Sequence, residues 1–405
     1  MPRNHHLDTI PSFSSRYSLG LVAVTMLLLA YSILFKMLPI LIFLMIWFAH
    51  IAYHPRAVFT PKWRDMIVLF LPLLALSSAL WSPFPAGTAY AGLEYIAMVF
   101  CAIICARFIE MKGFLLGLSA GGMAVVWIAI LSGQYTIDYI SGERSLVGYF
   151  GSKNITGLLS EITIIAAIFV FLMRGVSWWE KIVLGIIPCG LGFTGLWLSH
   201  SVSSGLSLCV ALLVMGCIWA FVRCPREMRQ FLLIFMALFG VTASLFAAGL
   251  MPEGYGALFE ILGKNPNLTG RTYLWAEGIK IVRENPIFGH GYQAFWQPGV
   301  AAAEQYWKEF GIDNKRGFHF HNIFIQTGVD LGIVGVVAVI GLLLFGWVRG
   351  IHAAITNDKN IEYIAIAVFM AMFTTRAFVE VDWLGPFGAA TFIFFYLLSC
   401  AYKRL

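Results

Sequence analysis

The chain has 405 residues, of which 60% are hydrophobic and only 12% are charged. This balance excludes a soluble globular domain and predicts an all-α, polytopic membrane protein, because helices that face lipid need no polar surface. The net charge of +6 would favour a nucleic-acid partner only if the basic residues clustered, whereas they are spread over short loops. The seven cysteines lie in apolar runs or in loops that we expect to be inside, so no disulfide framework is expected.

The apolar runs indicate how the chain is organised. A window of ~20 residues finds about twelve runs near spanning length. We therefore expect one integral membrane domain over residues 1–405 and no cleavable signal peptide, since a polar N-terminus leads directly into a full-length span. The runs begin near Leu19, Leu38, Met66, Ala89, Gly113, Asn154, Ile182, Leu206, Phe231, Asn322, Tyr363 and Gly385.

Lysines and arginines are distributed unevenly between the two sets of loops. With the N-terminus inside, the short outer loops carry only Lys36, Arg144, Lys153 and Arg376. By the positive-inside rule, the polar segment 251–321 then lies outside, which in a bacterium is the periplasm. The inner loops carry Arg56, Lys62, Arg64, Arg107, Lys112, Arg174, Lys181, Arg223, Arg226, Arg229, Arg349, Lys359, Lys403 and Arg404.

Residues 251–321 form one large loop between the ninth and tenth spans, and its pattern predicts an ordered fold. We expect an amphipathic helix that begins near Thr269 and ends at Asn285-Pro286, followed by a turn at Gly289 and Gly291. The expected apolar side of the helix consists of Leu274, Trp275, Gly278, Ile279, Ile281 and Val282. Three aromatic residues follow the turn: Tyr292, Phe295 and Trp296. We expect two of them to pack against the bundle. Stacking of an aromatic ring on a sugar is the alternative that the sequence leaves open.

The outer stretches 141–157, 199–205 and 376–383 face the same compartment as the large loop and carry the candidate chemistry. Guanidinium groups bind phosphate in a forked geometry, and a histidine can accept a hydroxyl proton near neutral pH. Cations that hold a diphosphate with a base beside them are what glycosyl transfer from a lipid-linked diphosphate sugar requires. The candidate base is His321, and the candidate substrate-binding residues are Arg271, Arg144, Lys153, His319, Asn322, Arg376 and His200.

Each candidate also has a structural interpretation that the sequence leaves open. His321 opens a span and can be a polar interface residue, and Arg271 can simply occupy the first turn of its helix. Arg144 and Lys153 can be solvated charges, as can Lys315 and Arg316. Arg376 can pair with Glu380 or Asp382, and the intramembrane Glu94 and Glu161 can be hydrogen-bond partners or can line a cavity.

Several motifs of this chain resemble those of a known family. GRTYLW, NPIFGHGY and HNIFIQTGVDLGIVG look like the signature of the bacterial O-antigen ligase and polysaccharide polymerase superfamily, and GYFGSKN at 148–154 resembles an earlier segment of it. The likeness runs from about Ser141 to Gly335. The residues within these motifs are most similar to those of exopolysaccharide repeat-unit polymerases of the ExoQ type.

The resemblance implies an inverting transfer from an undecaprenyl-diphosphate-linked glycan at the periplasmic face of the bacterial inner membrane, without metal or nucleotide. It implies His321 as general base and Arg271 as a cation for the diphosphate. The implied acceptor is the glycan of another lipid-linked repeat in a polymerase or the lipid A core in a ligase, and a chain-length co-polymerase is a further implied partner.

One departure from the family pattern concerns the serine-rich outer loop. Many relatives have an arginine there, whereas this chain reads SHSVSSG at 199–205, with His200. Lys153, Arg144 or His200 are the candidates for the missing cation. Two other classes stay open: a flippase of lipid-linked sugars, for which broken helices and mid-membrane charges would be typical, and a polytopic scaffold protein.

Overall fold

A computed structural model describes residues 13–55, 63–137, 142–224, 270–313, 315, 317–356 and 361–400. The predicted ninth span, near Phe231, lies outside the described residues, as do residues 251–269 and Arg316. Over the described part, the helices of the first half are α1 (Ser15–Ala30), α2 (Ser32–Phe35), α3 (Met37–Tyr53), α5 (Trp63–Ser77), α6 (Pro85–Phe108) and α7 (Met111–Leu131). Those of the second half are α8 (Lys153–Leu172), α9 (Trp178–Lys181), α10 (Ile187–Ser199), α11 (Val202–Arg223), α14 (Arg271–Glu284), α15 (Ala301–Glu309), α16 (Ile323–Thr356), α17 (Ile364–Ala377) and α18 (Ala389–Cys400).

Short elements complete the described chain. Strands β1 (Tyr135–Ile137) and β2 (Arg144–Leu146) pair antiparallel, with Thr136 opposite Ser145. The π-helical turn η3 (Ile182–Ile186) joins α9 to α10, and 3₁₀ turns follow α5 and precede α8 and α17 as η1 (Ser78–Leu80), η2 (Gly148–Phe150) and η5 (Ile361–Tyr363).

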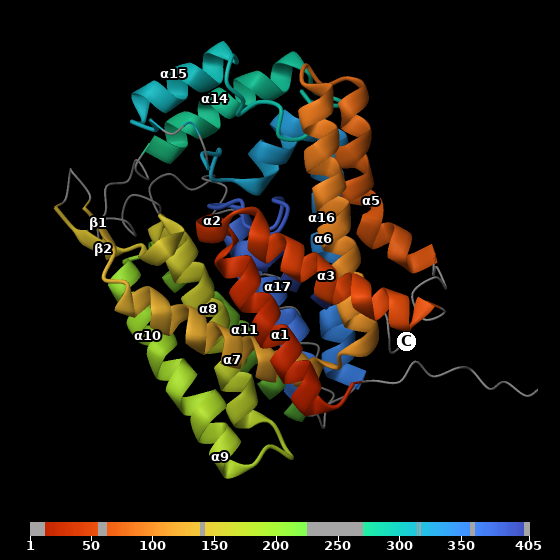
Figure 1. The fold of residues 1–405 in the computed structure, drawn as a ribbon, viewed down its shortest axis with the longest axis vertical. Coiled ribbons are helices and arrows are strands. Elements are labelled where there is room, and N and C mark those ends of the chain that lie inside the picture. Colours follow the sequence, from red (N-terminus) through yellow and green to blue (C-terminus); the bar gives the residue numbers. More distant parts are fainter. Residues whose placement is uncertain are drawn as a thin grey trace, which may run out of the picture.

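The helices form a bundle with α14 and α15 lying across its upper end and α9 at its lower end (Figure 1). Six described helical stretches are long and apolar enough to cross a membrane, and four shorter apolar helices accompany them. Every predicted apolar run except the ninth coincides with a described helical stretch. The helical membrane architecture is therefore confirmed, while the count of twelve spans stays a prediction.

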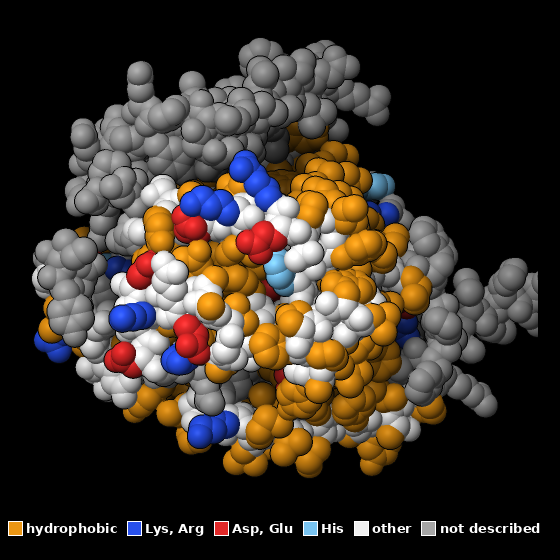
Figure 2. Space-filling view, turned by 90° about the horizontal axis from the view of Figure 1, so that it is seen from above, with side chains coloured by type: hydrophobic (Ala, Val, Ile, Leu, Met, Phe, Trp, Pro, Cys, Tyr) orange, Lys and Arg blue, Asp and Glu red, His pale blue; other side chains and the backbone are white. Residues whose placement is uncertain are grey.

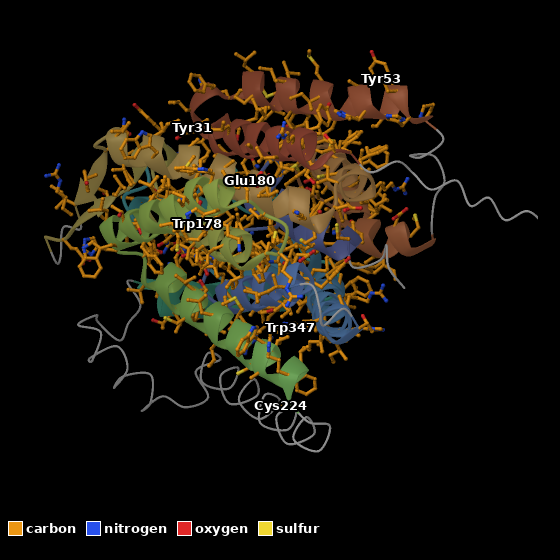
Figure 3. All side chains as sticks on the ribbon, turned by 90° about the horizontal axis from the view of Figure 1, so that it is seen from below. Tyr31, Tyr53, Trp178, Glu180, Cys224 and Trp347 are labelled. Atoms are coloured by element: carbon orange, nitrogen blue, oxygen red, sulfur yellow. The ribbon has the colours of Figure 1, made fainter. Side chains whose placement is uncertain are left out.

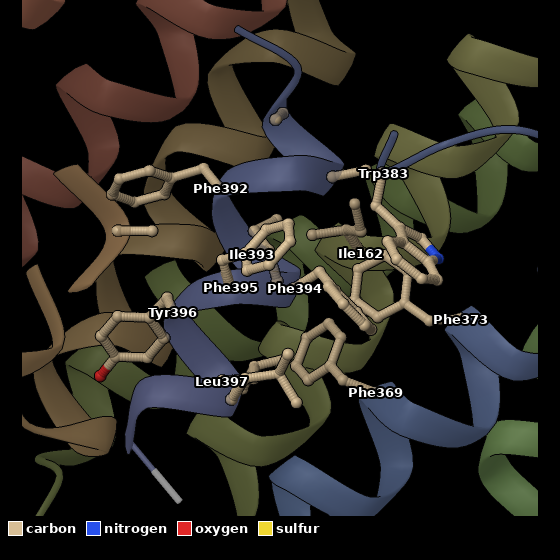
Figure 4. Close-up of a cluster of buried hydrophobic side chains, with 14 of the residues drawn as sticks. Ile162, Phe369, Phe373, Trp383, Phe392, Ile393, Phe394, Phe395, Tyr396 and Leu397 are labelled. Atoms are coloured by element: carbon tan, nitrogen blue, oxygen red, sulfur yellow. The ribbon is translucent and has the colours of Figure 1, made fainter. Parts of the chain in front are cut away.

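Helices α17 and α18 form the centre of the bundle and are buried on nearly all sides. Their residues are apolar around the whole helix, as expected for helices enclosed by others. The indole of Trp383 stacks on Phe394 with ring centroids 3.9 Å apart, beside Phe373, and Ile162 of α8 completes this packing (Figure 4).

Close helix packing near the N-terminus depends on glycine. Gly113, Gly117 and Gly121 repeat every four residues along α7 and face α1. A Cβ atom on Gly117 would lie 2.5 Å from Cβ of Val22, so the two helices approach too closely for any side chain there. Small residues at this spacing are typical of helix contacts within membranes, where van der Waals packing holds helices together.

Aromatic side chains mark the lower end of the bundle. Trp178 and Trp179 are exposed at α9, and Trp347 lies in the lower part of α16, where its indole N–H donates to Thr374 at 2.9 Å (Figure 3). The basic loops also neighbour one another there, because Lys112 donates to the carbonyl of Gly175 at 2.9 Å. Exposed tryptophans and neighbouring basic loops thus occupy the same end of the bundle, while the side of the membrane on which this end lies stays a prediction.

The described part of the large loop has a hydrophobic core of its own. Helix α14 runs from Arg271 to Glu284 with Asn285 as its C-cap, close to the predicted bounds, and buries Leu274, Gly278 and Ile281. Ile279 is 45% exposed, so its assignment to the packed side was wrong. Helix α15 covers the buried residues with Trp307 and Tyr306, and thus this part of the loop is an ordered cap.

Candidate functional site

The described parts of the four predicted outer stretches meet at the upper end of the bundle. Ser201 Oγ donates to Asn154 Oδ1 at 3.3 Å, which joins the serine-rich turn to the start of α8. Arg376 Nη1 donates to Ser204 Oγ at 2.6 Å, and Arg271 of α14 contacts the segment after α17. Viewed from above, histidine and charged side chains gather in the middle of this end, beside a large hydrophobic area (Figure 2).

Arg271 and His321 bind the same carboxylate. Arg271 Nη2 donates to Glu380 Oε1 at 2.6 Å, and His321 Nδ1 lies 3.3 Å from Glu380 Oε2. An ionised carboxylate can only accept, so this contact places the ring proton of a neutral His321 on Nδ1 and leaves Nε2 as the base. The structure therefore brings together the expected base and the expected diphosphate cation, although the sequence separates them by the rest of the loop.

Glu380 is buried, at 3% exposure, in the turn between α17 and α18. Burial alone would raise the pKa of its carboxyl, but the hydrogen bond from His321 and the positive charge of Arg271 outweigh burial and lower the pKa below its ordinary value. Glu380 is thus a fixed anion. The sequence indicated Glu380 only as a possible partner of Arg376, and its contacts with Arg271 and His321 were not predicted.

His321 lies at the junction between the loop and α16, with a left-handed backbone at φ +50°. Asn322 follows it, and Asn322 Oδ1 accepts from the backbone N–H groups of Phe324 at 2.9 Å and Ile325 at 3.1 Å. Its amide nitrogen donates to the carbonyl of Phe378 at 3.1 Å. Asn322 is therefore the N-cap of α16, and these bonds favour a structural role over the expected substrate contact.

His319 lies beside His321 with ring centroids 4.3 Å apart, and its Nδ1 accepts from the backbone N–H of His321 at 3.1 Å. Burial lowers the pKa of His319 to about 3, and the neighbouring His321 and Arg271 contribute in the same direction. The ring is therefore neutral near pH 7. It can form hydrogen bonds but supplies no positive charge, and its contact with a substrate stays a prediction.

His319, His321 and Glu380 have the residue types and mutual reach of a metal-binding group, with one ligand atom from each within 4.8 Å of the others. Two features favour a hydrogen-bonded cluster instead. The guanidinium of Arg271 holds Glu380, which places a permanent cation beside the group, and a backbone N–H occupies Nδ1 of His319. The expectation of a metal-independent reaction stays a prediction.

Helix α16 is interrupted at Gly332, where φ is +62° and ψ is −161°. The turn predicted at Gly289 and Gly291 fills this break with backbone hydrogen bonds. Above the break, the carbonyls of Val329 and Asp330 each accept at 2.8 Å, from the N–H groups of His290 and Gly291. The interrupted backbone is thus satisfied within the protein, as a buried or membrane-embedded helix break requires.

The lower half of α16 binds the same turn. Ile333 N–H donates to the carbonyl of Pro286 at 2.9 Å, and Val334 N–H donates to that of Ile287 at 3.4 Å. A Cβ atom on Gly332 would lie 2.2 Å from the carbonyl oxygen of Ile287, and one on Gly289 would lie 2.5 Å from the backbone of Asp330. The two glycine motifs therefore contact each other directly, and this contact fixes the cap on α16 about three helical turns after His321.

Hydrogen bonds of Gln326 connect α16 to the aromatic residues of the cap and to Phe320, which precedes His321. Gln326 Oε1 accepts from the indole of Trp296 at 3.2 Å and from the backbone N–H of Phe320 at 3.3 Å, while its Nε2 donates to Asp330 at 3.2 Å. Tyr292 and Phe295 are buried, which confirms packing for two of the three aromatic residues after the turn. Trp296 is half-buried between Phe318 and Phe320.

Arg376 is 1% exposed and its guanidinium is committed to buried partners. Its Nε donates to Asp382 at 2.5 Å, its Nη2 to the other oxygen of Asp382 at 3.1 Å, and its Nη1 lies 3.5 Å from Glu161. The expected substrate contact is thus less well supported than the structural pairing that the sequence left open. Arg376 joins α8, α11 and the turn that carries Glu380.

The three candidates for the missing cation lie on the serine-rich turn, on β2 and at the start of α8. His200 Nδ1 lies 2.9 Å from Glu143, with a left-handed backbone at φ +48°. A hollow of about 320 Å³ adjoins it, bounded by Phe193 and Trp197. Arg144 lies over the ring of Tyr135, 4.5 Å from its centroid, and Lys153 is the first residue of α8. Their place in substrate binding stays a prediction.

Comparison with known proteins shows which class of protein this chain resembles. A family model described as O-antigen ligase matches residues 187–340, which include α10, α11, α14, the helix break and His321. The resemblance to the O-antigen ligase and polysaccharide polymerase superfamily that the motifs indicated is confirmed by this match and by a similar protein.

One similar protein aligns with most of the chain. The chain is 29% identical over 389 residues to the exopolysaccharide production protein ExoQ of Rhizobium meliloti (strain 1021). That alignment covers 95% of this chain and 88% of the relative. The ExoQ-type likeness seen in the motifs therefore extends over most of the chain, and it supports a membrane enzyme of polysaccharide polymerisation or ligation.

Proposed function

We propose that the chain is an inverting glycosyltransferase that polymerises undecaprenyl-diphosphate-linked repeat units at the periplasmic face of the bacterial inner membrane. The observation that carries this proposal is the convergence of Arg271 and His321 on Glu380 at one end of an apolar helix bundle. The similarity to an exopolysaccharide production protein supports polymerisation as the reaction.

The donor enters from the membrane, with its isoprenoid in lipid and its diphosphate beneath the loop cap. The guanidinium of Arg271 binds the diphosphate and offsets the charge that builds up on it. His321 Nε2 removes the proton from an acceptor hydroxyl on a second lipid-linked repeat. The hydroxyl oxygen forms a bond to the anomeric carbon, the bond from that carbon to the phosphate oxygen breaks, and undecaprenyl diphosphate leaves with both bonding electrons.

Substitutions in the purified protein test this mechanism. In liposomes supplied with defined lipid-linked repeats, His321→Ala and Arg271→Ala should lose polymer formation by about 10²-fold or more, the usual contribution of a positioned acid–base group or oxyanion stabiliser. Matched controls are His352→Ala, near the lower end of α16, and Arg283→Ala, in the last turn of α14. Near-normal polymer from both site variants would refute the assignment.

Further arms test the parts of the proposal that concern metal, topology and acceptor. Polymer formation should persist in a chelator, and reporter fusions should place His321 and Arg271 on the periplasmic side. Ligation is the second candidate, because the matched family model is described as O-antigen ligase. Supplying lipid A core alongside the repeats separates the two: a polymerase lengthens lipid-linked repeats, whereas a ligase attaches sugar to the core.

A further inference from the structure

Glu380 holds both residues that the proposed reaction needs. Its two carboxylate oxygens are divided between them, Oε1 to Arg271 at 2.6 Å and Oε2 to His321 at 3.3 Å. With a side chain 4% exposed, Glu380 is sealed from bulk water, whereas His321 keeps 23% of its side chain exposed. The base is thus accessible and its partner anion is enclosed, as in a carboxylate–imidazole pair in which the acid orients the ring.

The other charged groups around Glu380 are already paired. Arg271 comes from α14, and His321 and His319 come from the segment before α16. On the side of α17, Arg376 is bound by Asp382 through two hydrogen bonds and does not reach Glu380 within the distance of a salt bridge. The carboxylate of Glu380 therefore has two partners, the guanidinium of Arg271 and the imidazole of His321.

A diphosphate on Arg271 changes this balance. The donor brings at least two negative charges to the guanidinium that Glu380 occupies, and two anions sharing one cation in a poorly solvated site repel strongly. We propose that Glu380 is the positioning residue of His321, and that the donor diphosphate displaces Glu380 from Arg271 so that its carboxylate serves His321 alone. This inference rests on the proposed function and adds to it an order of events.

The order follows from the charges. Without donor, Arg271 partly neutralises Glu380, so the imidazole gains less from the carboxylate than it would from an unshared one. With donor bound, the released carboxylate stabilises the imidazolium that forms when His321 accepts the hydroxyl proton. His321 becomes an effective base only after the diphosphate has bound, so the donor binds before the acceptor is deprotonated.

Replacing Glu380 by glutamine separates its two roles. Glutamine has almost the same shape but carries no charge, so Arg271 is released while His321 loses its anion. Undecaprenyl diphosphate, titrated into nanodiscs and followed by tryptophan fluorescence, should bind Glu380→Gln about fivefold more tightly, because a larger fraction of the protein has a free guanidinium. In the polymer assay, kcat should fall by about 10²-fold or more. Glu380→Asp should recover part of kcat, and Glu284→Gln, on the exposed end of α14, should match the wild type.

The opposing signs of the two effects distinguish positioning from a structural role. A glutamate that merely stabilises the fold would weaken both binding and kcat when replaced, so weaker or unchanged binding in Glu380→Gln would overturn the proposal. So would a kcat within threefold of the wild type. Failure of the proposed function would look different: His321→Ala and Arg271→Ala would keep their activity whatever Glu380→Gln does.

Discussion

Replacing Gly332 by alanine tests the contact between the cap and α16 most directly. At φ +62° and ψ −161°, the backbone occupies a region almost exclusive to glycine, and the new Cβ would lie 2.2 to 2.5 Å from the backbone of Ile287 and Phe288. Backbone strain of this kind costs about 1–3 kcal/mol and forced close contact about the same, so we expect a loss near 4 kcal/mol. Backbone atoms cannot rotate away as a side chain would.

Gly341 provides the matched control, because it lies in the lower part of the same helix, where a new Cβ atom would meet no neighbouring atom within 4 Å. Gly341→Ala should be neutral or should stabilise the helix by up to about 1 kcal/mol. Unfolding followed by tryptophan fluorescence in detergent should show a clear decrease in Tm for Gly332→Ala only, together with earlier proteolysis of the 286–291 turn. A Tm within 1 °C of the wild type, at normal protein levels, would contradict the interlocked structure.

Substitutions at three further positions test the surroundings of the candidate site. His319 has a pKa lowered to about 3, so between that pH and its ordinary pKa near 6.5 the unfolded chain binds a proton that the folded chain does not, and stability falls as pH drops below 6.5. His319→Asn keeps an acceptor for the His321 N–H, and its Tm should decrease less between pH 6.5 and 4.5; an equal decrease would exclude His319 as the cause. Asn322→Ala removes the N-cap of α16 and should cost about 1 kcal/mol in denaturant titration, whereas Asn322→Asp should be close to neutral. Arg376→Met leaves Asp382 buried without its cation and should cost about 3–5 kcal/mol, or prevent accumulation in the membrane, and a stable variant would mean that the pair contributes little.

Hydrophobic pattern and loop charge were sufficient to predict the helical membrane class and the grouping of the outer stretches at one end. They work because apolar runs report the lipid environment and basic loops report the side of the membrane. They failed at Ile279, which the helical period assigns to the packed side but which is 45% exposed. A helix that lies across a bundle buries a narrower stripe than its apolar residues suggest.

The candidate site shows a different limit. Arg271 and His321 were predicted because guanidinium and imidazole groups suit diphosphate binding and proton transfer, and because both lie in motifs that resemble those of a known family. Glu380 did not stand out, because Arg376 lies four residues earlier and offers a nearer partner in sequence. In the folded chain, Asp382 accepts hydrogen bonds from Arg376, whereas Glu380 contacts Arg271 and His321. The sequence alone does not show this pairing. Which acid pairs with which base depends on side-chain direction, and spacing along the chain does not report it.

The same limit applies to the glycine motifs. Gly289 and Gly291 could be recognised as a turn and Gly332 as part of a family motif, yet nothing in their spacing indicates that the two segments touch. Their contact is made by backbone atoms, which every residue possesses, so the sequence records it only through the absence of side chains.

The interrupted helix has a consequence for how the protein is made. Residues 286–291, which close the break, precede Gly332 in the chain and are therefore synthesised before it. A nascent α16 entering lipid alone would expose the polar groups of Val329, Asp330 and Ile333, which hydrocarbon does not tolerate. We therefore expect α16 to reach its final position only once the 286–291 turn has docked on it.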